Sequence, residues 1–208
     1  MLYFYRMKTV FSAFDAAYWQ GRYVAGRDAW DVRAATPPLR AYFDQLDLVG
    51  QPRILIPGAG RAYEAECLHQ LGFRQVFVAD LAPEPLHALA ARVPDFPIAH
   101  LLQADFFALS NAQPYDLIVE QTFFCALAPT LRPAYAQQCA ALLRPSGTLM
   151  GLLFDTDFGS VQEPPFGGTR EEYREYFAPY FDFQHFETAS NSLPPRQGRE
   201  LFICLKKK

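Results

Sequence analysis

Two glycines and an aspartate are spaced in a way that is typical of nucleoside binding. Gly58 and Gly60 follow the apolar segment 54–56, and Asp80 stands at the end of the next apolar segment. Glycine lets the backbone turn sharply and approach a ligand, and a helix that begins there offers free N–H groups. A carboxylate at this spacing can accept both hydroxyls of a ribose. The pattern predicts a cofactor that contains a nucleoside, although such turns also join strands to helices without a ligand.

Asp105 and Phe106 form a second pair with possible binding chemistry, at the end of another apolar segment. An acid in this place can bond an adenine amino group, and the aromatic residue can stack against its ring. The alternative is an aspartate that caps a helix beside phenylalanines of the core. The sequence leaves both interpretations open.

An aromatic set lies near the start of the chain, at Trp19, Tyr23 and Trp30. Trp19 and Tyr23 are four residues apart, so they would share one face of a helix. Taken alone, the set is typical of a helix that packs its aromatic residues on the surface of a domain.

Apolar runs and helical spacing predict the elements that must position these residues. Strands are predicted at 54–56, 76–78, 96–102, 115–120, 148–154, 181–189 and 200–205. Helices are predicted at 39–46 with Thr36 as N-cap, and at 61–71, 83–93, 132–143 and 169–177. This alternation predicts an α/β fold with a mostly parallel sheet. Ligands of such sheets bind at the carboxyl ends of the strands, here 57–60, 80, 105–106 and 120–125.

The composition indicates one domain with a full core. The chain has 208 residues, and 50% of them are hydrophobic. No apolar run reaches the ~18 residues of a membrane span, and no signal-peptide pattern is present. A formal charge of −3 with scattered basic residues argues against a nucleic-acid surface. We expect a soluble, cytoplasmic protein without membrane or nucleic-acid partners, and Met7 is a second candidate for its first residue.

The four cysteines lie far apart and form no C-x-x-C pair. Few histidines stand near them, so the sequence indicates neither a metal site nor a disulfide framework. Cys125 sits in an apolar run with no evident histidine or acid partner, which favours a core cysteine over a nucleophile.

At this point the motifs resemble a known family, the thiopurine and thiol (halide) methyltransferases. The resemblance runs from about residue 18 to the C-terminus and rests on W-x3-Y-x6-WD, ILIPGAGRAYEAE, QADFF, YDLIVEQTFFCALAPTLRPAYA, LLRPSGTLMGLLF and the EPPF loop. The FFCAL-x-P-x-x-RPAYA stretch is the most specific, because a generic nucleotide fold does not require it. The LPPRQGRE segment at 193–200 looks more like the plant and bacterial thiol or halide enzymes.

The resemblance implies a Rossmann-like class I methyltransferase fold that uses S-adenosylmethionine. The expected architecture is a mostly parallel seven-stranded sheet with helices on both faces and an N-terminal helical arm. The chain is expected to form a single domain, 1–208, with an arm at 1–46 that covers the cofactor and a core at 47–208. The expected partner is a small-molecule methyl acceptor, and the expected state is a monomer or weak homodimer.

The family pattern also implies roles for individual residues. An aromatic cover over the cofactor would comprise Trp19, Tyr23 and Trp30. Gly58 and Gly60 would lie along the methionine end of the cofactor, and Asp80 would bind its ribose. The adenine would lie at Asp105 and Phe106. Gln121 would sit near the methyl group, and Arg132 and Phe166 are expected on the substrate side.

The sequence departs from the family pattern at three of these positions. Ala62 replaces the third glycine of the turn, Tyr23 stands where many relatives have tryptophan, and Gln121 stands where tyrosine or arginine is common. These changes bear on acceptor choice and affinity more than on the fold.

The expected reaction is transfer of a methyl group to a small soft nucleophile, which is a thiol, hydrosulfide, a halide or a thiopurine sulfur. A thiol with a pKa of ~8.5 is about 3% thiolate at pH 7, and a halide needs no base. No general base stands out, so no catalytic residue is predicted. The alternatives are an NAD-dependent oxidoreductase, although position 63 is Tyr where a third glycine is expected, and a non-catalytic cofactor-binding module.

Overall fold

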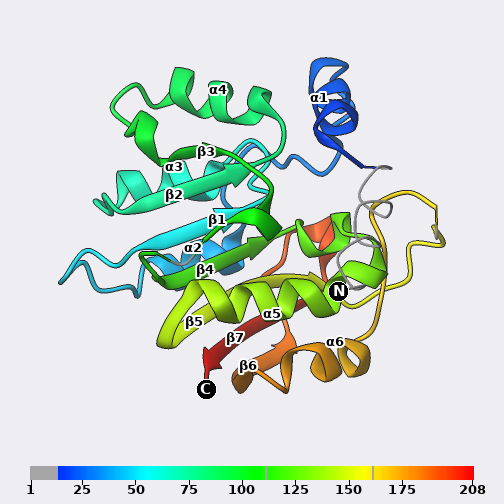
Figure 1. The fold of residues 1–208 in the computed structure, drawn as a ribbon. Coiled ribbons are helices and arrows are strands. Elements are labelled where there is room, and N and C mark those ends of the chain that lie inside the picture. The colour runs from blue at the N-terminus through cyan, green and yellow to red at the C-terminus, as the bar shows by residue number, and fades with distance from the viewer. Residues whose placement is uncertain (1–13, 111, 161) are drawn as a thin grey trace, which may run out of the picture.

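The protein folds around a seven-stranded sheet with the strand order β3-β2-β1-β4-β5-β7-β6 (Figure 1). The computed structural model describes residues 14–110, 112–160 and 162–208, so Met7 lies outside the described residues. The strands are β1 (Ile54–Pro57), β2 (Val76–Asp80), β3 (Leu101–Gln103), β4 (Tyr115–Gln121), β5 (Leu143–Phe154), β6 (Phe181–Thr188) and β7 (Glu200–Lys207). The first five run parallel, whereas β7 is antiparallel to β5 and to β6. The predicted mostly parallel α/β fold is confirmed.

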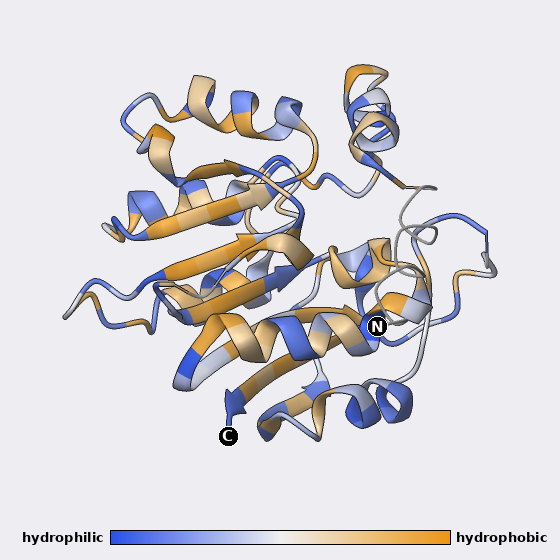
Figure 2. Ribbon diagram, viewed as in Figure 1, coloured by the Kyte–Doolittle hydropathy of each residue, from blue (hydrophilic) through white to orange (hydrophobic). Residues whose placement is uncertain are grey.

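Helices cover both faces of the sheet because alternate strand residues point to opposite sides. On β1, Ile54 and Ile56 enter one core, which includes side chains of α2 (Pro37–Phe43), α3 (Tyr63–Gln70) and α4 (Pro83–Arg92). Leu55 enters the other core, with α5 (Arg132–Leu142) and α6 (Arg170–Phe177). Figure 2 shows the result as continuous hydrophobic colour along the central strands and mixed colour along the helices. Short apolar runs that are buried on both faces are typical of parallel strands.

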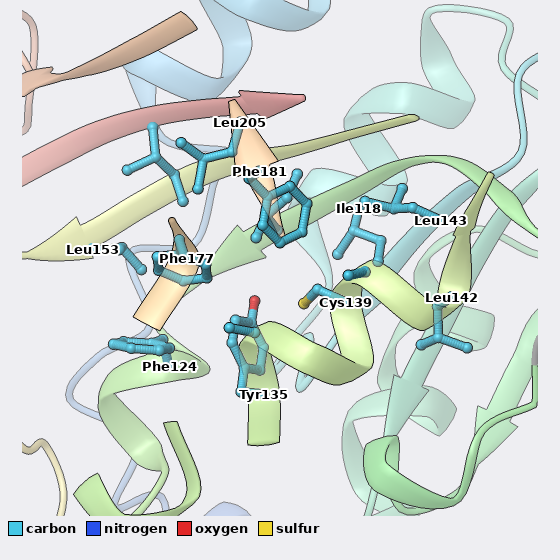
Figure 3. Packing of buried hydrophobic residues seen from close by; sticks show 14 of the residues in the cluster. Ile118, Phe124, Tyr135, Cys139, Leu142, Leu143, Leu153, Phe177, Phe181 and Leu205 are labelled. Atoms are coloured by element: carbon cyan, nitrogen blue, oxygen red, sulfur yellow. The ribbon is translucent and has the colours of Figure 1, made fainter. Parts of the chain in front are cut away.

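The second core is built on aromatic rings. Tyr135 of α5 lies with its ring centre 5.3 Å from that of Phe124 and 6.3 Å from that of Phe177. Figure 3 shows these rings beside Cys139, which is fully buried. Edge-to-face rings at such spacing add to the stability that burial itself gives. This core packs against the segment after β4, which includes Phe123 and Phe124.

Two predicted strands differ clearly in their bounds, and one predicted N-cap lacks its side-chain bond. The strand predicted at 96–102 is reduced to β3, since Pro97 has no N–H for the ladder and Ile98–His100 form a 3-10 turn. β5 begins five residues earlier than predicted, because Leu143 pairs with Tyr115 across an irregular register. Thr36 stands at the N-cap of α2, but its side chain makes no capping bond. Thr169 is the N-cap of α6, and its hydroxyl accepts from the Glu172 N–H.

The N-terminal segment adds helix α1 (Ala16–Val24), whose N-cap Asp15 accepts a hydrogen bond from the Tyr18 N–H at 2.9 Å. The Gln20 side-chain oxygen accepts a hydrogen bond from the Glu84 N–H at the start of α4. α1 therefore stands beside the β2–β3 side of the sheet, near its carboxyl edge (Figure 1). None of the described helices is long and apolar enough to cross a bilayer.

We predict that Gly151→Ala lowers the free energy of unfolding by about 1–3 kcal/mol, as overpacking does. Gly151 pairs with Glu120 in the centre of the sheet, and a Cβ atom there would overlap the Glu120 backbone. Urea denaturation measures the change. Gly21→Ala in α1 is the control, since a Cβ atom there meets nothing within 4 Å and alanine favours a helix. Equal stability of Gly151→Ala and the wild type would contradict the strand pairing.

Candidate functional site

A cavity of about 540 Å³ lies over the carboxyl edge of the parallel strands. Its walls come from the ends of β1 to β5, from the segment before β7 and from α1. Seven of the residues predicted from the sequence line it, namely Trp19, Tyr23, Trp30, Gly58, Asp80, Asp105 and Phe106. This volume is typical of a site for one small ligand.

Asp80 is buried in the floor of the cavity and is held by backbone donors. Its Oδ1 accepts from the Ala82 N–H at 2.9 Å, and its Oδ2 accepts from the Gly60 N–H at 3.3 Å. Burial raises the pKa of this carboxyl to about 6, against the effect of these hydrogen bonds. An ionised carboxylate has about four acceptor positions, so two remain for a ligand. Gly60 does not line the cavity, but its N–H positions the Asp80 carboxylate, which does.

The glycine turn is built from left-handed backbone. Gly58, Gly60 and Ala62 have φ angles of 54°, 52° and 57°. A Cβ atom on Gly58 would overlap the Phe123 ring, so only glycine fits there. At Ala62 the same conformation costs roughly 1–2 kcal/mol, which is the penalty of replacing the third glycine of the family pattern. The Ala62 methyl group is buried in the core with α3, which offsets part of that cost.

Asp105 combines the two interpretations that the sequence left open. Its side chain accepts from the Phe107 N–H at 2.9 Å and so caps the 3-10 turn Phe106–Ala108. The same residue lines the cavity. Phe106 also lines the cavity while its ring packs 5.3 Å from Tyr135 in the core.

The aromatic cover consists of Trp19, Tyr23 and Trp30. The Trp30 ring stands edge-to-face with Trp19 at 5.8 Å and with Tyr23 at 5.7 Å between centroids. A methyl group placed on Gly60 would lie 3.5 Å from the Tyr23 hydroxyl and 3.7 Å from the Trp30 indole nitrogen. The cover therefore rests directly on the glycine turn. Burial raises the pKa of Tyr23 far above its usual range, so its hydroxyl stays neutral.

Salt bridges and a long-range hydrogen bond hold the cover in place. Arg61, within the glycine turn, pairs with Asp28 at 2.9 Å. On the other side, Nη2 of Arg196 donates to the Trp30 carbonyl at 2.8 Å. Arg196 is nine-tenths buried and pairs through Nη1 with Glu200 at 3.3 Å. The cover is thus tied to both halves of the sheet.

Sequence reasoning missed the arginines that line the cavity. The guanidinium-bearing residues Arg22, Arg196 and Arg199 all line it. Arg199 has no carboxylate partner among the described residues; its Nε lies 3.4 Å from the Thr156 hydroxyl, and its guanidinium lies over the Phe158 ring. The available signal was the LPPRQGRE segment, which holds two of the three arginines. This segment is far from the glycine turn in sequence, so the sequence did not show that its arginines line the same cavity as Gly58.

The acidic and thiol groups of the lining are all poorly suited to act as bases. Asp15, Asp80 and Asp105 each accept backbone N–H bonds. Burial raises the pKa of the Cys125 thiol to about 12, so it remains protonated. No histidine of the described residues lines the cavity, and these residues contain no group of three side chains suited to bind a metal.

Glu120 does not line the cavity, but it fixes the turn after β4 that does. It is fully buried and accepts from the Phe123 N–H at 2.8 Å, the Phe124 N–H at 2.9 Å and the Tyr135 hydroxyl at 2.6 Å. These bonds set the turn after β4, which includes Thr122 with a φ of 57°. Burial raises the pKa of Glu120 to about 7.

Besides Gly60, three predicted residues do not line the cavity. Gln121 ends β4, and its side-chain oxygen is buried without a partner among the described residues. Arg132 is fully buried, where it donates to the carbonyls of Phe166 and Gly167 at 2.9 Å each. Phe166 is also buried, beside Phe14. Through these bonds Arg132 holds the loop after β5. Pro164 and Pro165 of this loop line the cavity.

Comparison with known proteins gives consistent results. A model of the family described as thiopurine S-methyltransferase matches residues 14–206. The chain is 31% identical to a probable thiol methyltransferase 2 of Arabidopsis thaliana, over 88% of this chain and 81% of that one. It is 29% identical to thiocyanate methyltransferase 1 of Brassica oleracea, over 88% and 81%.

Solved structures show the same fold. The 1,6-didemethyltoxoflavin-N1-methyltransferase of Burkholderia thailandensis, solved with S-adenosylhomocysteine, superimposes with a TM-score of 0.73 at 22% identity. The match covers 93% of this chain and 87% of the other. At this identity the likeness concerns the fold alone.

We predict that Arg132→Met lowers the free energy of unfolding by at least about 3 kcal/mol. The change leaves two loop carbonyls without their charged donor, and each such bond is worth ~1.5–3 kcal/mol. Urea denaturation measures this loss. The control is Arg40→Met, which removes an exposed pair with Asp44 worth ~1 kcal/mol or less. A loss at position 132 no greater than that of the control would contradict the loop-holding role.

Proposed function

Because the chain belongs to the thiopurine S-methyltransferase family, we propose that it transfers a methyl group from S-adenosylmethionine to a small soft anion. Family membership favours a transferase over an NAD-dependent oxidoreductase. It also favours a transferase over a non-catalytic module, since the chain retains both the aromatic cover and the loop after β5.

The residues of the cavity suit this cofactor. The two free acceptor positions of Asp80 fit a pair of ribose hydroxyls, and Asp105 with Phe106 offers an acceptor and an apolar edge for an adenine. Gly58 lines the cavity at the turn after β1. The oxygen of Gln121 is buried outside the lining, so we assign it no contact with the cofactor. We therefore assign the cofactor to the β1–β2–β3 half of the cavity.

Bound S-adenosylmethionine supplies an electrophilic methyl group with a neutral leaving thioether. The protein has to align the acceptor with that group and exclude water, and such positioning can lower a barrier by roughly 7–11 kcal/mol. The aromatic cover and the loop after β5 enclose the reacting atoms for this purpose. No side chain has to take part as an acid or base if the acceptor arrives as an anion.

The observation that carries this proposal is a guanidinium in the lining that has no carboxylate partner. Arg199 lines the cavity without such a partner among the described residues, while Arg196 beside it is paired with Glu200. Arg196 and Arg199 stand just before β7, four strands from β2. We call this part of the lining the cationic end, and we infer that the acceptor enters beside it.

The relatives agree with an anionic acceptor. One is named for thiols and another for thiocyanate, and both groups react as soft anions. The aromatic walls at Phe154 and Phe158 also leave room for an aryl thiolate. The finer choice of acceptor is the part of the proposal that an assay must decide.

We predict methyl transfer to hydrosulfide, thiocyanate and iodide in preference to 6-mercaptopurine. The assay follows methyl transfer from labelled S-adenosylmethionine to these four acceptors and to thiophenol, with Asp80→Ala as the background control. Preference for the small anions supports the cationic end as the acceptor site. Turnover with 6-mercaptopurine alone would contradict this acceptor site. No methyl transfer to any of the five acceptors, with the cofactor still bound, would exclude this acceptor class.

We predict that Asp80→Ala weakens the binding of S-adenosylhomocysteine by at least about tenfold, because hydrogen bonds to a charged group are worth ~1.5–3 kcal/mol each. Isothermal titration calorimetry measures the dissociation constant. Asp182→Ala, at an exposed position, is the control. Unchanged affinity in a folded Asp80→Ala protein would remove Asp80 from the ribose site.

The same carboxyl predicts a pH dependence. Since the pKa of Asp80 is about 6 and ribose hydroxyls donate to the ionised form, binding of S-adenosylhomocysteine should be full above pH 6 and should weaken as the pH falls below it. The Asp80→Asn variant, which cannot ionise, should lack this fall between pH 7 and pH 5. Equal pH profiles for both proteins would show that another group controls binding.

A further inference from the structure

We propose that Arg196 is a positioning residue that fixes the aromatic cover and thereby tightens the binding of the cofactor. The inference rests on the proposed function of the cavity and adds a residue to it. It starts from one contact, the hydrogen bond from Nη2 of Arg196 to the Trp30 carbonyl at 2.8 Å, which joins positions 166 residues apart.

Trp30 needs such support because it lies outside any helix. α1 ends at Val24, and the segment from there to Thr36 contains only turns and bends. Its ring nevertheless contacts Trp19 and Tyr23, and its indole nitrogen lies next to Gly60. A backbone that carries a central ring of the cover has to be fixed from elsewhere in the molecule.

Arg196 is itself rigidly held. It is only 9% exposed, its Nη1 pairs with Glu200, and its guanidinium lies 5.6 Å from the centre of the Phe154 ring. Glu200 is the first residue of β7, where it pairs with Phe154 of β5. A guanidinium that uses two separate nitrogens can bond a carboxylate and a carbonyl at once. The side chain therefore links the Trp30 backbone to the rigid sheet.

A second buried acid lies nearby. Glu64, at the start of α3, is buried and accepts from the Thr36 N–H at 3.4 Å, and burial raises the pKa of its carboxyl to about 7, which the charge of Arg196 partly offsets. Thr36 closes the segment that carries Trp30. The guanidinium thus bonds Glu200 and the Trp30 carbonyl, and Glu64 adds a further bond to the same segment.

The other support of the cover acts on the opposite side. Arg61 reaches Asp28 from the glycine turn, and the Gln20 side chain accepts a hydrogen bond from the Glu84 N–H of α4. Both contacts come from the β1–β2–β3 half of the sheet. In Figure 1, α1 stands at that half, whereas β7 belongs to the other. Arg196 provides a link from the β7 half, so its loss should free one side of the cover.

The chain offers a direct readout of this role. It contains two tryptophans, and both are in the cover. Intrinsic fluorescence and its quenching by acrylamide therefore report on the cover alone, without any cofactor. This measurement is independent of the proposed function, whereas titration with S-adenosylhomocysteine depends on it.

The test variant is Arg196→Met with Glu200→Gln, which removes both charges of the buried pair and leaves neither partner as an unpaired charge. Arg199→Gln is the matched control, since it removes a guanidinium from the same cavity wall but no bond to Trp30. Glu200→Gln alone is the second control, because it keeps the bond to the carbonyl.

We expect the double variant to show red-shifted emission and a higher acrylamide quenching constant, and neither control to do so. We also expect its dissociation constant for S-adenosylhomocysteine to rise about tenfold, the equivalent of one lost hydrogen bond. The KM for the cofactor should rise with little change in kcat. Unchanged quenching in the double variant, or an equal change in either control, would overturn the proposal.

If the double variant does not fold, Arg196→Lys is measured instead. Its single ammonium keeps the charge beside Glu64 and Glu200 but lacks the two separate donor nitrogens. Increased quenching in this folded variant supports the proposal, and wild-type quenching overturns it. Failure of the wild type to bind S-adenosylhomocysteine would refute the proposed function while leaving the quenching result valid.

Discussion

The hydrogen bond from the Gly60 N–H to the Asp80 carboxylate is the constraint on which the cavity depends. It joins the turn after β1 to the end of β2, and it requires left-handed backbone at Gly58 and Gly60. Burial makes the ionised carboxylate costly, so the backbone donors around it are needed to keep it in place. The aromatic cover then rests on this turn, and its position follows from that of Asp80.

Guanidinium groups organise the rest of the site. Arg132 holds the loop after β5, Arg61 holds one side of the aromatic cover, and Arg196 contacts its other side. Each has its donors directed at carbonyls or carboxylates in a fixed geometry, which a lysine could not reproduce. They fix the irregular segments of the cavity wall to the helices and strands around them. A structurally similar N-methyltransferase shows that the fold alone does not choose the acceptor.

Local pattern was sufficient for most of the fold. The apolar run at 54–56 and the glycine turn each depend on neighbours within a few residues, so their positions could be predicted from the sequence. The start of β5 could not, because Leu143 joins the strand by pairing with Tyr115 of β4, which is distant in sequence. Resemblance to a family supplied the candidate site, and seven of its residues meet at one cavity.

The sequence by itself determined the order of strands and helices, the glycine turn with Asp80 at the end of the next strand, and the family. These follow from periodicity and from short motifs, in which the interacting groups are close along the chain. Only the tertiary structure decided that Arg132 is buried under a loop, that Arg196 bonds the Trp30 carbonyl, and that three arginines share one cavity. The depth of a side chain and its partner across 166 residues depend on how the sheet brings distant segments together, which no local pattern encodes.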